Sequence, residues 1–346
     1  MNLLKFFTER ASGGQSMVLA TVFETIGSTY SKAGGQMIID SGGNFCGMLS
    51  GGCLEGDLVE RARRVIESGV AETASYDLSA DDELWGLGVG CDGTMRVLLQ
   101  PLSPETEYQP FAAIADILEG DEPAALAIVV SADSSSIKAG ASLLLKDGRE
   151  RNFGMSDIVA RSVANGADSE SPAVMRQVDT PDGHCVVLYT RIEPPPALLI
   201  LGAGLDSEPV VRIASELGWR CSVVDHRPAY IEGRSYPDPI KTLCCPADEL
   251  SQQVRLEHFD LAIVMSHHLA SDRAYLRQLA ASNIAYVGLL GPIGRRKRLM
   301  NDLADVADAL QSRLHGPAGI DLGGRGPGPI ALAIIAEMQQ FLNQRG

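Results

Sequence analysis

Hydrophobic periodicity in the second half of the chain predicts a β–α–β unit over residues 198–225. Residues 198–201 are apolar without alternation, as in a strand that is buried on both faces. Apolar residues at helical spacing follow, and Gly218 ends that helix. A second apolar strand, residues 221–224, closes on Asp225. The unit is typical of a Rossmann-like, doubly wound parallel sheet.

Hydrophobic periodicity also predicts strands and helices along the rest of both halves of the chain. The predicted strands are residues 17–25, 36–40, 44–49, 71–78, 94–100, 124–131, 174–178, 185–191, 261–265 and 285–289. The predicted helices are residues 2–10, 54–68, 108–118, 157–164, 301–314 and 330–342. Three prolines at 194–196 cannot extend a sheet and indicate a linker. We therefore expect an α/β protein with two domains, a mixed α/β domain over residues 1–193 and the Rossmann-like domain over residues 194–346.

Composition narrows the class of protein. With 346 residues and 45% hydrophobic residues, the chain has enough apolar surface for two cores. It contains no apolar run of membrane-spanning length and no signal-peptide pattern, so we expect a cytoplasmic protein without a membrane partner. The formal net charge of −15 argues against sequence-independent binding of nucleic acid, and the basic cluster at 295–298 is too short to change that.

The turn after residues 198–201 carries the first candidate chemistry. Gly202 and Gly204 would direct backbone N–H groups and a helix N-terminus towards a phosphate. Ser207 stands where the third glycine of the dinucleotide-binding motif is usual, and a small residue can replace that glycine. Asp225 is placed to accept from ribose hydroxyls, which favours NAD over NADP, although the nearby Arg227 tempers this preference. The alternative for Asp225 is a solvated carboxylate at a strand end.

His267 follows the predicted strand at residues 261–265. The carboxyl ends of parallel strands face the ligand crevice, so His267 is a candidate cofactor-binding residue. A purely structural role for this histidine is the alternative.

The loop at residues 27–35 consists mainly of glycine and hydroxyl residues with a single cation. Ser28, Thr29 and Lys32 could wrap an oxyanion as hydrogen-bond donors. A flexible connection between strands explains the same composition.

A second glycine turn precedes the predicted helix at residues 54–68. Ser50, Gly51 and Gly52 would present N–H groups at the helix start, where a thiolate at Cys53 is favoured. Cys91 also lies among glycines, in a loop that lets a ligand approach the backbone. A buried, inert thiol is the alternative for Cys53. The seven cysteines form no CxxC pair and therefore give no zinc signature and no obvious disulfide framework.

Several distinctive segments, in order and at matching spacing, resemble the XdhC/CoxI family of accessory proteins for xanthine and carbon monoxide dehydrogenases. In the N-terminal half they are residues 27–29, 47–57, 76–78 and 86–93. In the C-terminal half they are residues 202–204, 224–228, 266–267, 286–291, 314–323 and 330–337. The departures from the family pattern are Asp92, Ser266, His268 and the Gly-Pro-Gly-Pro run at 326–329.

The resemblance implies a protein that binds molybdenum cofactor (molybdopterin), protects it during sulfuration and delivers it to a molybdenum hydroxylase. The implied partners are that hydroxylase and a cysteine desulfurase, and a homodimer is expected. Cys53 and Cys91 would be candidate ligands of the molybdenum, with NAD(P) as a second cofactor in the Rossmann-like domain.

Two other classes of function remain open from the sequence. One is a nicotinamide-dependent oxidoreductase that uses Asp225 for the cofactor and His267 as acid and base. The other is a scaffold that joins desulfurase and client enzyme without binding either cofactor.

Overall fold

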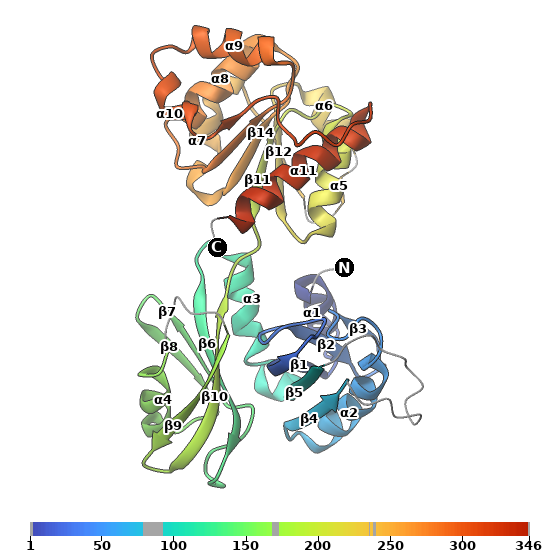
Figure 1. Ribbon diagram of the computed structural model, residues 1–346, viewed down its shortest axis with the longest axis vertical. Coiled ribbons are helices and arrows are strands. Elements are labelled where there is room, and N and C mark those ends of the chain that lie inside the picture. Colours follow the sequence, from blue (N-terminus) through green and yellow to red (C-terminus); the bar gives the residue numbers. More distant parts are fainter. Residues whose placement is uncertain (1–2, 79–92, 168–172, 235, 238–239, 345–346) are drawn as a thin grey trace. The chain divides into compact units, whose positions relative to one another are not determined.

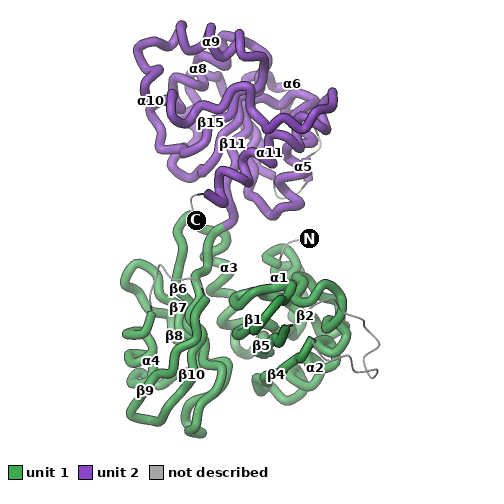
Figure 2. Tube along the Cα trace, in the orientation of Figure 1, with its two compact units in different colours: residues 1–194 green, residues 195–346 purple. Residues whose placement is uncertain are grey.

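The computed structural model describes residues 3–78, 93–167, 173–234, 236–237 and 240–344. The chain divides into two compact units, residues 1–194 and residues 195–346 (Figure 2). The division lies within the proline run that predicts the linker. Within the described ranges, no helix is both long enough and apolar enough to cross a bilayer.

The first unit contains two antiparallel sheets. The strands of the first sheet lie in the order β3-β2-β1-β5-β4, and those of the second in the order β8-β7-β6-β10-β9. The first sheet comprises β1 (Met17–Gly27), β2 (Gln36–Asp40), β3 (Phe45–Cys46), β4 (Glu72–Asp77) and β5 (Gly93–Leu102). The second comprises β6 (Ala124–Ala132), β7 (Ser142–Lys146), β8 (Arg149–Phe153), β9 (Val174–Thr180) and β10 (Gly183–Ile192).

Helices pack against these two sheets (Figure 1). They are α1 (Leu3–Ser12), α2 (Glu55–Ser68), α3 (Phe111–Glu119) and α4 (Asp157–Ala164), with a 3-10 turn at Pro104–Thr106. Helix α2 packs on one face of the first sheet, and α4 packs on one face of the second. Strand β1 is buried on both faces, because its alternate residues Val18 and Leu19 enter different cores.

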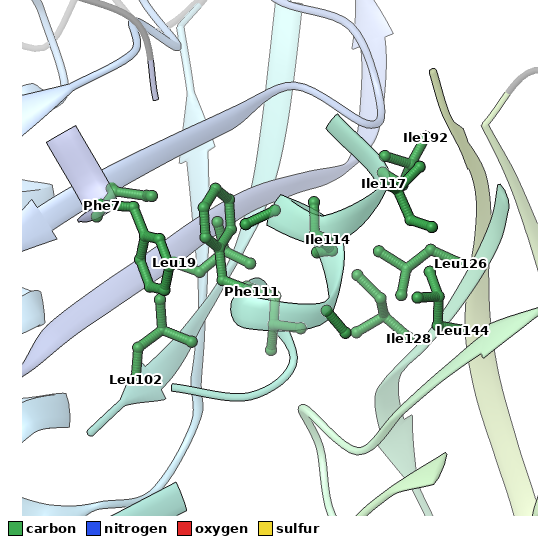
Figure 3. Packing of buried hydrophobic residues seen from close by; sticks show 14 of the residues in the cluster. Phe7, Leu19, Leu102, Phe111, Ile114, Ile117, Leu126, Ile128, Leu144 and Ile192 are labelled. Atoms are coloured by element: carbon green, nitrogen blue, oxygen red, sulfur yellow. The ribbon is translucent and has the colours of Figure 1, made fainter. Parts of the chain in front are cut away.

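The two sheets of the first unit share a core built around α3. Phe111 and Ile114 of this helix meet Leu19 of the first sheet and Leu126 and Ile128 of the second (Figure 3). All five side chains are at most 1% exposed. This continuous apolar layer joins the two sheets into one unit, since separating them would expose it to water.

The second unit is a parallel six-stranded sheet with helices on both faces, which confirms the predicted fold class. The strand order β13-β12-β11-β14-β15-β16 reverses direction between β11 and β14, where such sheets bind ligands. The strands are β11 (Ala197–Leu201), β12 (Arg220–Asp225), β13 (Lys241–Cys244), β14 (Leu261–Val264), β15 (Tyr286–Leu289) and β16 (Leu314–His315).

The helices of the second unit form a layer on each face of the sheet (Figure 1). One layer contains α5 (Ser207–Glu216) and α11 (Pro327–Asn343), and α6 (Pro228–Glu232) follows β12. The other layer contains α7 (Leu250–Gln253), α8 (Leu269–Ala280), α9 (Ile293–Asp302) and α10 (Ala307–Gln311), with 3-10 turns at Ala247–Glu249 and Leu256–His258.

The predicted helix over residues 301–314 is wrong. The helix begins earlier, at Ile293, and includes the basic cluster, and Leu299 is its fully buried residue. A short helix then ends at Gln311, and Leu314 begins β16. Pairing of Leu314 with Val287 extends the sheet, so a tertiary contact overrides the local helical pattern.

Candidate functional site

The glycine turn before α2 folds around a carboxylate of its own chain. Glu55 is 3% exposed, and its side chain accepts from the N–H groups of Leu49, Ser50, Gly52 and Leu54 at 3.0–3.2 Å. The Ser50 hydroxyl also donates to it. Burial raises the pKa of Glu55, but these hydrogen bonds outweigh burial and hold the pKa below its ordinary value. Glycine is needed at position 52 because φ is +112° there.

This arrangement changes the role of three predicted site residues. The N–H groups of Ser50 and Gly52 and the Ser50 hydroxyl donate to Glu55, so they stabilise the turn. Gly51 is exposed, and no hydrogen bond of its N–H group occurs among the described residues. Cys53 is half-buried and lies just before Leu54, the N-cap of α2, so the helix begins two residues beyond the thiol. Cys91 lies outside the described residues.

The structure brings the two predicted N-terminal loops together. The Ser31 N–H group donates to the Leu49 carbonyl at 3.3 Å, and the Ser31 hydroxyl donates to the Met48 carbonyl at 3.0 Å. A Cβ atom added at Gly51 would lie 3.5 Å from the Tyr30 ring. We call this combined surface, residues 28–32 and 50–53, the loop face.

The predicted donors of the first loop differ in availability. Thr29 is 8% exposed and its hydroxyl donates to the Ser31 carbonyl at 2.8 Å, so it holds the loop in shape. Gly93 packs against the backbone of this loop, since a Cβ atom added there would lie 2.5 Å from the Ser28 carbonyl oxygen. The side chains of Ser28 and Lys32 are exposed on the loop face. Ser28 and Lys32 can therefore reach a bound anion.

In the second unit, the turn after β11 has room only for glycine at position 202. Its φ is +127°, and an added Cβ atom would lie 2.5 Å from the Met265 carbonyl oxygen. Gly202 thus lets β11 and the end of β14 approach closely. Ser207, at the place of the third motif glycine, is fully buried, and its hydroxyl donates to the Gly204 carbonyl at 2.7 Å. This hydrogen bond stabilises the turn, and the buried serine occupies the position that the third glycine has in the motif.

Asp225 is fully buried at the end of β12 and already has four hydrogen-bond donors. Oδ1 accepts from the backbone N–H group and Nε of Arg227, both at 2.9 Å, and Oδ2 accepts from Arg227 Nη2 and the Ala203 N–H group, both at 2.8 Å. Burial raises the pKa of Asp225, but Arg227 and the backbone donors reverse this and lower it. A carboxylate has about four acceptor positions, so a ribose would have to displace one of these donors.

A cavity of about 460 Å³ lies at the strand ends near Gly204. Arg227 and Arg234 both line it, and the Tyr230 ring centroid lies 3.6 Å from Arg227 Cζ and 5.9 Å from Arg234 Cζ. The beginning of α11 forms another part of the wall. The lining side chains and turns also include Leu205, Asp206, His267, Gly326, Pro327 and Ile330.

His267 lies in this cavity as predicted from its position after β14. Its Nε2 atom is 2.6 Å from Oδ2 of Asp206, which is the N-cap residue of α5. The backbone of His267 has φ of +59°, an unfavourable conformation for a residue with a Cβ atom. Such strain occurs often at ligand-binding sites, which supports a functional role for this histidine.

The neighbours of His267 serve the scaffold. The Ser266 hydroxyl donates to Asp272, which is 1% exposed and also accepts from Nε and Nη2 of Arg295. His268 caps α8 by accepting from the Ser271 N–H group. These contacts fix the end of β14 and so the position of His267. Within the described residues, no group of three or more histidine, cysteine, aspartate or glutamate side chains could hold a metal ion.

Two family models match this chain, one in each unit. The model of the XdhC Rossmann domain matches residues 198–338, and the model of the XdhC and CoxI family matches residues 11–77. The chain belongs to the XdhC and CoxI family. The two matched ranges include the turn at Gly202, the cavity, and both loops of the loop face.

Relatives in this family match most or part of the chain. A probable xanthine dehydrogenase subunit of Bacillus subtilis (strain 168) is 29% identical over 332 residues, covering 94% of this chain and 93% of that protein. A crystal structure of a xanthine dehydrogenase from Bacillus halodurans has a TM-score of 0.80 at 28% identity, covering 100% of this chain and 97% of that one. The molybdenum cofactor insertion chaperone PaoD of Escherichia coli (strain K12) is 29% identical over 125 residues, covering 36% of this chain and 37% of PaoD.

Four residues of the two candidate sites were not expected there from the sequence: Glu55, Asp206, Tyr230 and Arg234. No capping-box signal marked Glu55, because Leu54 is the N-cap of α2 and Glu55 is the first residue of the helix. No local signal existed for Tyr230 and Arg234. Their segments are joined to the glycine turn only by the fold.

Proposed function

We propose that this chain is an accessory protein that binds molybdenum cofactor, assists its sulfuration and helps to insert it into a molybdenum hydroxylase of the xanthine or carbon monoxide dehydrogenase type. The observation that carries the proposal is the similarity to PaoD, a protein named for inserting molybdenum cofactor, within family matches in both units. The Bacillus subtilis relative, which matches 94% of the chain, supports a client of the xanthine dehydrogenase type.

The loop face is the proposed binding surface for the molybdopterin. Its exposed Ser28 hydroxyl, the Lys32 ammonium group and the Gly51 N–H group suit the terminal phosphate of the cofactor, since all three donate hydrogen bonds to anions. Thr29 and the donors of Ser50 and Gly52 hold the two loops in position. The Cys53 thiol, with Cys91, is proposed to meet the molybdenum of this cargo, because thiolates are soft ligands.

The partners proposed for this role are the apo-hydroxylase and a cysteine desulfurase that supplies the sulfur. We also propose a homodimer. Light scattering after size-exclusion chromatography measures the mass directly, and a monomer at all concentrations would remove the dimer from the proposal.

Reconstitution of an apo molybdenum hydroxylase with cofactor, with and without this protein, tests the function. We expect the protein to increase the fraction of sulfurated, active hydroxylase without changing hydroxylase abundance. Cys53→Ala, Cys91→Ala and Lys32→Gln should each lower this gain. Cys244→Ala is the matched control, because it removes an exposed thiol from the second unit.

The outcomes separate the parts of the proposal. If the cysteine variants equal the unsubstituted protein, the thiols do not take part, while the carrier role stands. If the unsubstituted protein gives no gain with its proper client, the accessory function is wrong.

For the cavity of the second unit we propose a second ligand, a dinucleotide that lies against Gly204 with His267 beside it. The Gly202 N–H group donates to the Val224 carbonyl at 2.8 Å, so Gly202 shapes the turn. In this proposal Asp225 acts through Arg227, whose guanidinium it holds. The alternative function is an NAD(P)-dependent oxidoreductase, in which His267, paired with Asp206, would serve as acid and base. Turnover of NAD(P)H by the purified protein would support the oxidoreductase, and mass spectrometry of co-purified pterin would support the carrier.

A further inference from the structure

Arg227 presents an uncommitted side of its guanidinium group to the cavity. Its Nε and Nη2 atoms donate to the two oxygens of Asp225, and Nη2 also lies 3.5 Å from the Ser266 carbonyl. Among the described residues, Nη1 has no hydrogen-bond partner. The ion pair fixes the plane of the group, and its stacking on Tyr230 covers one face. Nη1 therefore carries two N–H groups that can donate to a ligand, and the ion pair and the stacking hold the guanidinium in place.

Arg234 lies in the same cavity and is also only partly committed. Nε donates to the Ala203 carbonyl at 3.1 Å, and Nη1 lies 3.4 Å from Glu208 Oε1. Nη2 has no partner in the described part of the chain. The side chain is 18% exposed, so these contacts hold it against the glycine turn. Among the described residues, Nη1 of Arg227 and Nη2 of Arg234 together hold four N–H groups without a hydrogen-bond partner, and both guanidinium groups lie within 6 Å of the Tyr230 ring centroid.

The charges around these donors are nearly balanced. Asp225 compensates Arg227 and Glu208 compensates Arg234, while Asp206 Oδ2 lies 2.6 Å from His267 Nε2. The N-terminus of α11, a helix of 17 residues, adds positive potential where Gly326 and Pro327 line the cavity. An incoming anion would thus find free N–H donors and a helix N-terminus without having to displace an existing ion pair.

The position of the donors selects the kind of anion. In dinucleotide-binding folds, the residue at the end of the second strand accepts from the ribose hydroxyls, and an arginine nearby accommodates a ribose 2′-phosphate. Asp225 is at the first of these positions, but its four acceptor positions are filled, and Arg227 neutralises the charge that would repel a phosphate. The preference for NAD that Asp225 alone suggests is therefore removed.

We infer that Arg227 and Arg234 bind the 2′-phosphate of an NADP-type dinucleotide in the cavity of the second unit, so that the protein selects NADP over NAD. This inference rests on the proposal that this cavity holds a dinucleotide. It is independent of the molybdenum cofactor on the loop face. The phosphate monoester is the recognised group, and the adenosine attached to it distinguishes the dinucleotide from free phosphate.

Calorimetric titration of the full chain with NADP⁺, NAD⁺, adenosine 2′,5′-bisphosphate and inorganic phosphate tests the inference. NADP⁺ should bind more tightly than NAD⁺ by about tenfold or more, because the 2′-phosphate gains charge-assisted hydrogen bonds. Arg234→Gln should remove most of this ratio by weakening NADP⁺ and not NAD⁺. Arg255→Gln, which removes an exposed arginine paired with Glu257, should leave the ratio unchanged.

Controls keep the result interpretable if a variant is unstable. Thermal unfolding is recorded for each variant, and Arg234→Lys, which keeps the charge but loses the planar fork, replaces Arg234→Gln if the latter does not fold. A lowered NADP⁺/NAD⁺ ratio in Arg234→Lys supports the inference equally.

Three results would overturn the inference. If NADP⁺ and NAD⁺ bind equally well, the protein does not recognise the 2′-phosphate, and the cavity is a dinucleotide site without that preference. Equal binding of inorganic phosphate and adenosine 2′,5′-bisphosphate reduces the site to an anion site. If neither dinucleotide binds to a preparation that still activates the apo-hydroxylase, the dinucleotide proposal is wrong. The accessory function then stands without it.

Discussion

Asp225 and Arg227 form a two-pronged ion pair at the end of β12, in which Nε lies 2.9 Å from Oδ1 and Nη2 lies 2.8 Å from Oδ2. The carboxylate is fully buried, and the guanidinium is 30% exposed at the cavity. Asp225 thus links the glycine turn, through the Ala203 N–H group, to the arginine that lines the cavity. It acts as a positioning residue of the cavity.

Replacing this carboxylate by an amide should destabilise the second unit. Asp225→Asn loses the charge that pairs with Arg227 and keeps the size, so we expect a loss of about 1–3 kcal/mol in the free energy of unfolding. Dinucleotide binding should weaken about tenfold as Arg227 loses its support. Denaturant unfolding and calorimetry measure the two effects. Asp305→Asn, at the exposed pair with Arg277, is the control, and an equal effect there would contradict the role of Asp225.

Glu55 should make the first unit sensitive to acid. Its pKa in the folded protein lies below the ordinary value of 4.5, so the ionised carboxylate stabilises the fold above that value. The stabilisation is lost as the pH falls through the lowered pKa. Glu55→Gln should cost about 1–3 kcal/mol at pH 7 and flatten the decrease in stability that the unsubstituted protein shows as the pH falls below the ordinary pKa of a glutamate.

Urea unfolding at a series of pH values measures this dependence. Glu60→Gln, on the exposed side of α2, is the matched control and should keep the acid sensitivity of the unsubstituted protein. An unchanged pH profile in Glu55→Gln would show that the turn does not depend on the ionised carboxylate.

Two glycine substitutions should change stability in opposite directions. Gly202→Ala places a Cβ atom 2.5 Å from the Met265 carbonyl oxygen at a positive φ, so it should cost at least about 1–3 kcal/mol. Gly294→Ala, in α9 with no atom within 4 Å of the new Cβ, should be neutral or stabilise by up to about 1 kcal/mol. Thermal unfolding compares the two. If both variants unfold alike, the close approach at Gly202 is not a constraint.

The thiols should differ strongly in reactivity. Cys221 is 5% exposed inside β12, and burial raises its pKa to about 12, so little of its nucleophilic thiolate exists at neutral pH. Cys53 is half-buried on the loop face and should be alkylated first of the two. Peptide mapping after a short pulse of iodoacetamide measures this order, with exposed Cys244 as the reference. Faster labelling of Cys221 would contradict both environments.

Much of the fold could be predicted because its signals are local. The apolar run at 198–201, the helical spacing after Gly204 and the strand ending at Asp225 each depend on neighbouring residues, and all are confirmed. The family resemblance also rests on short segments of neighbouring residues, and the two family models confirm it. The helix expected at 301–314 failed where a strand pairing between Leu314 and Val287 outweighs local periodicity.

The sequence by itself determined the β–α–β unit, the glycine at position 202 and the location of both candidate sites along the chain. Only the tertiary structure decided which groups occupy the donors and acceptors at those sites. Ser50 and Gly52 donate to Glu55, and Asp225 accepts from Arg227, leaving Arg234, brought in from a later segment, to complete the cavity. The physical reason is that a buried polar group takes whichever partner the packed chain brings within about 3 Å, and spacing along the sequence does not specify that partner.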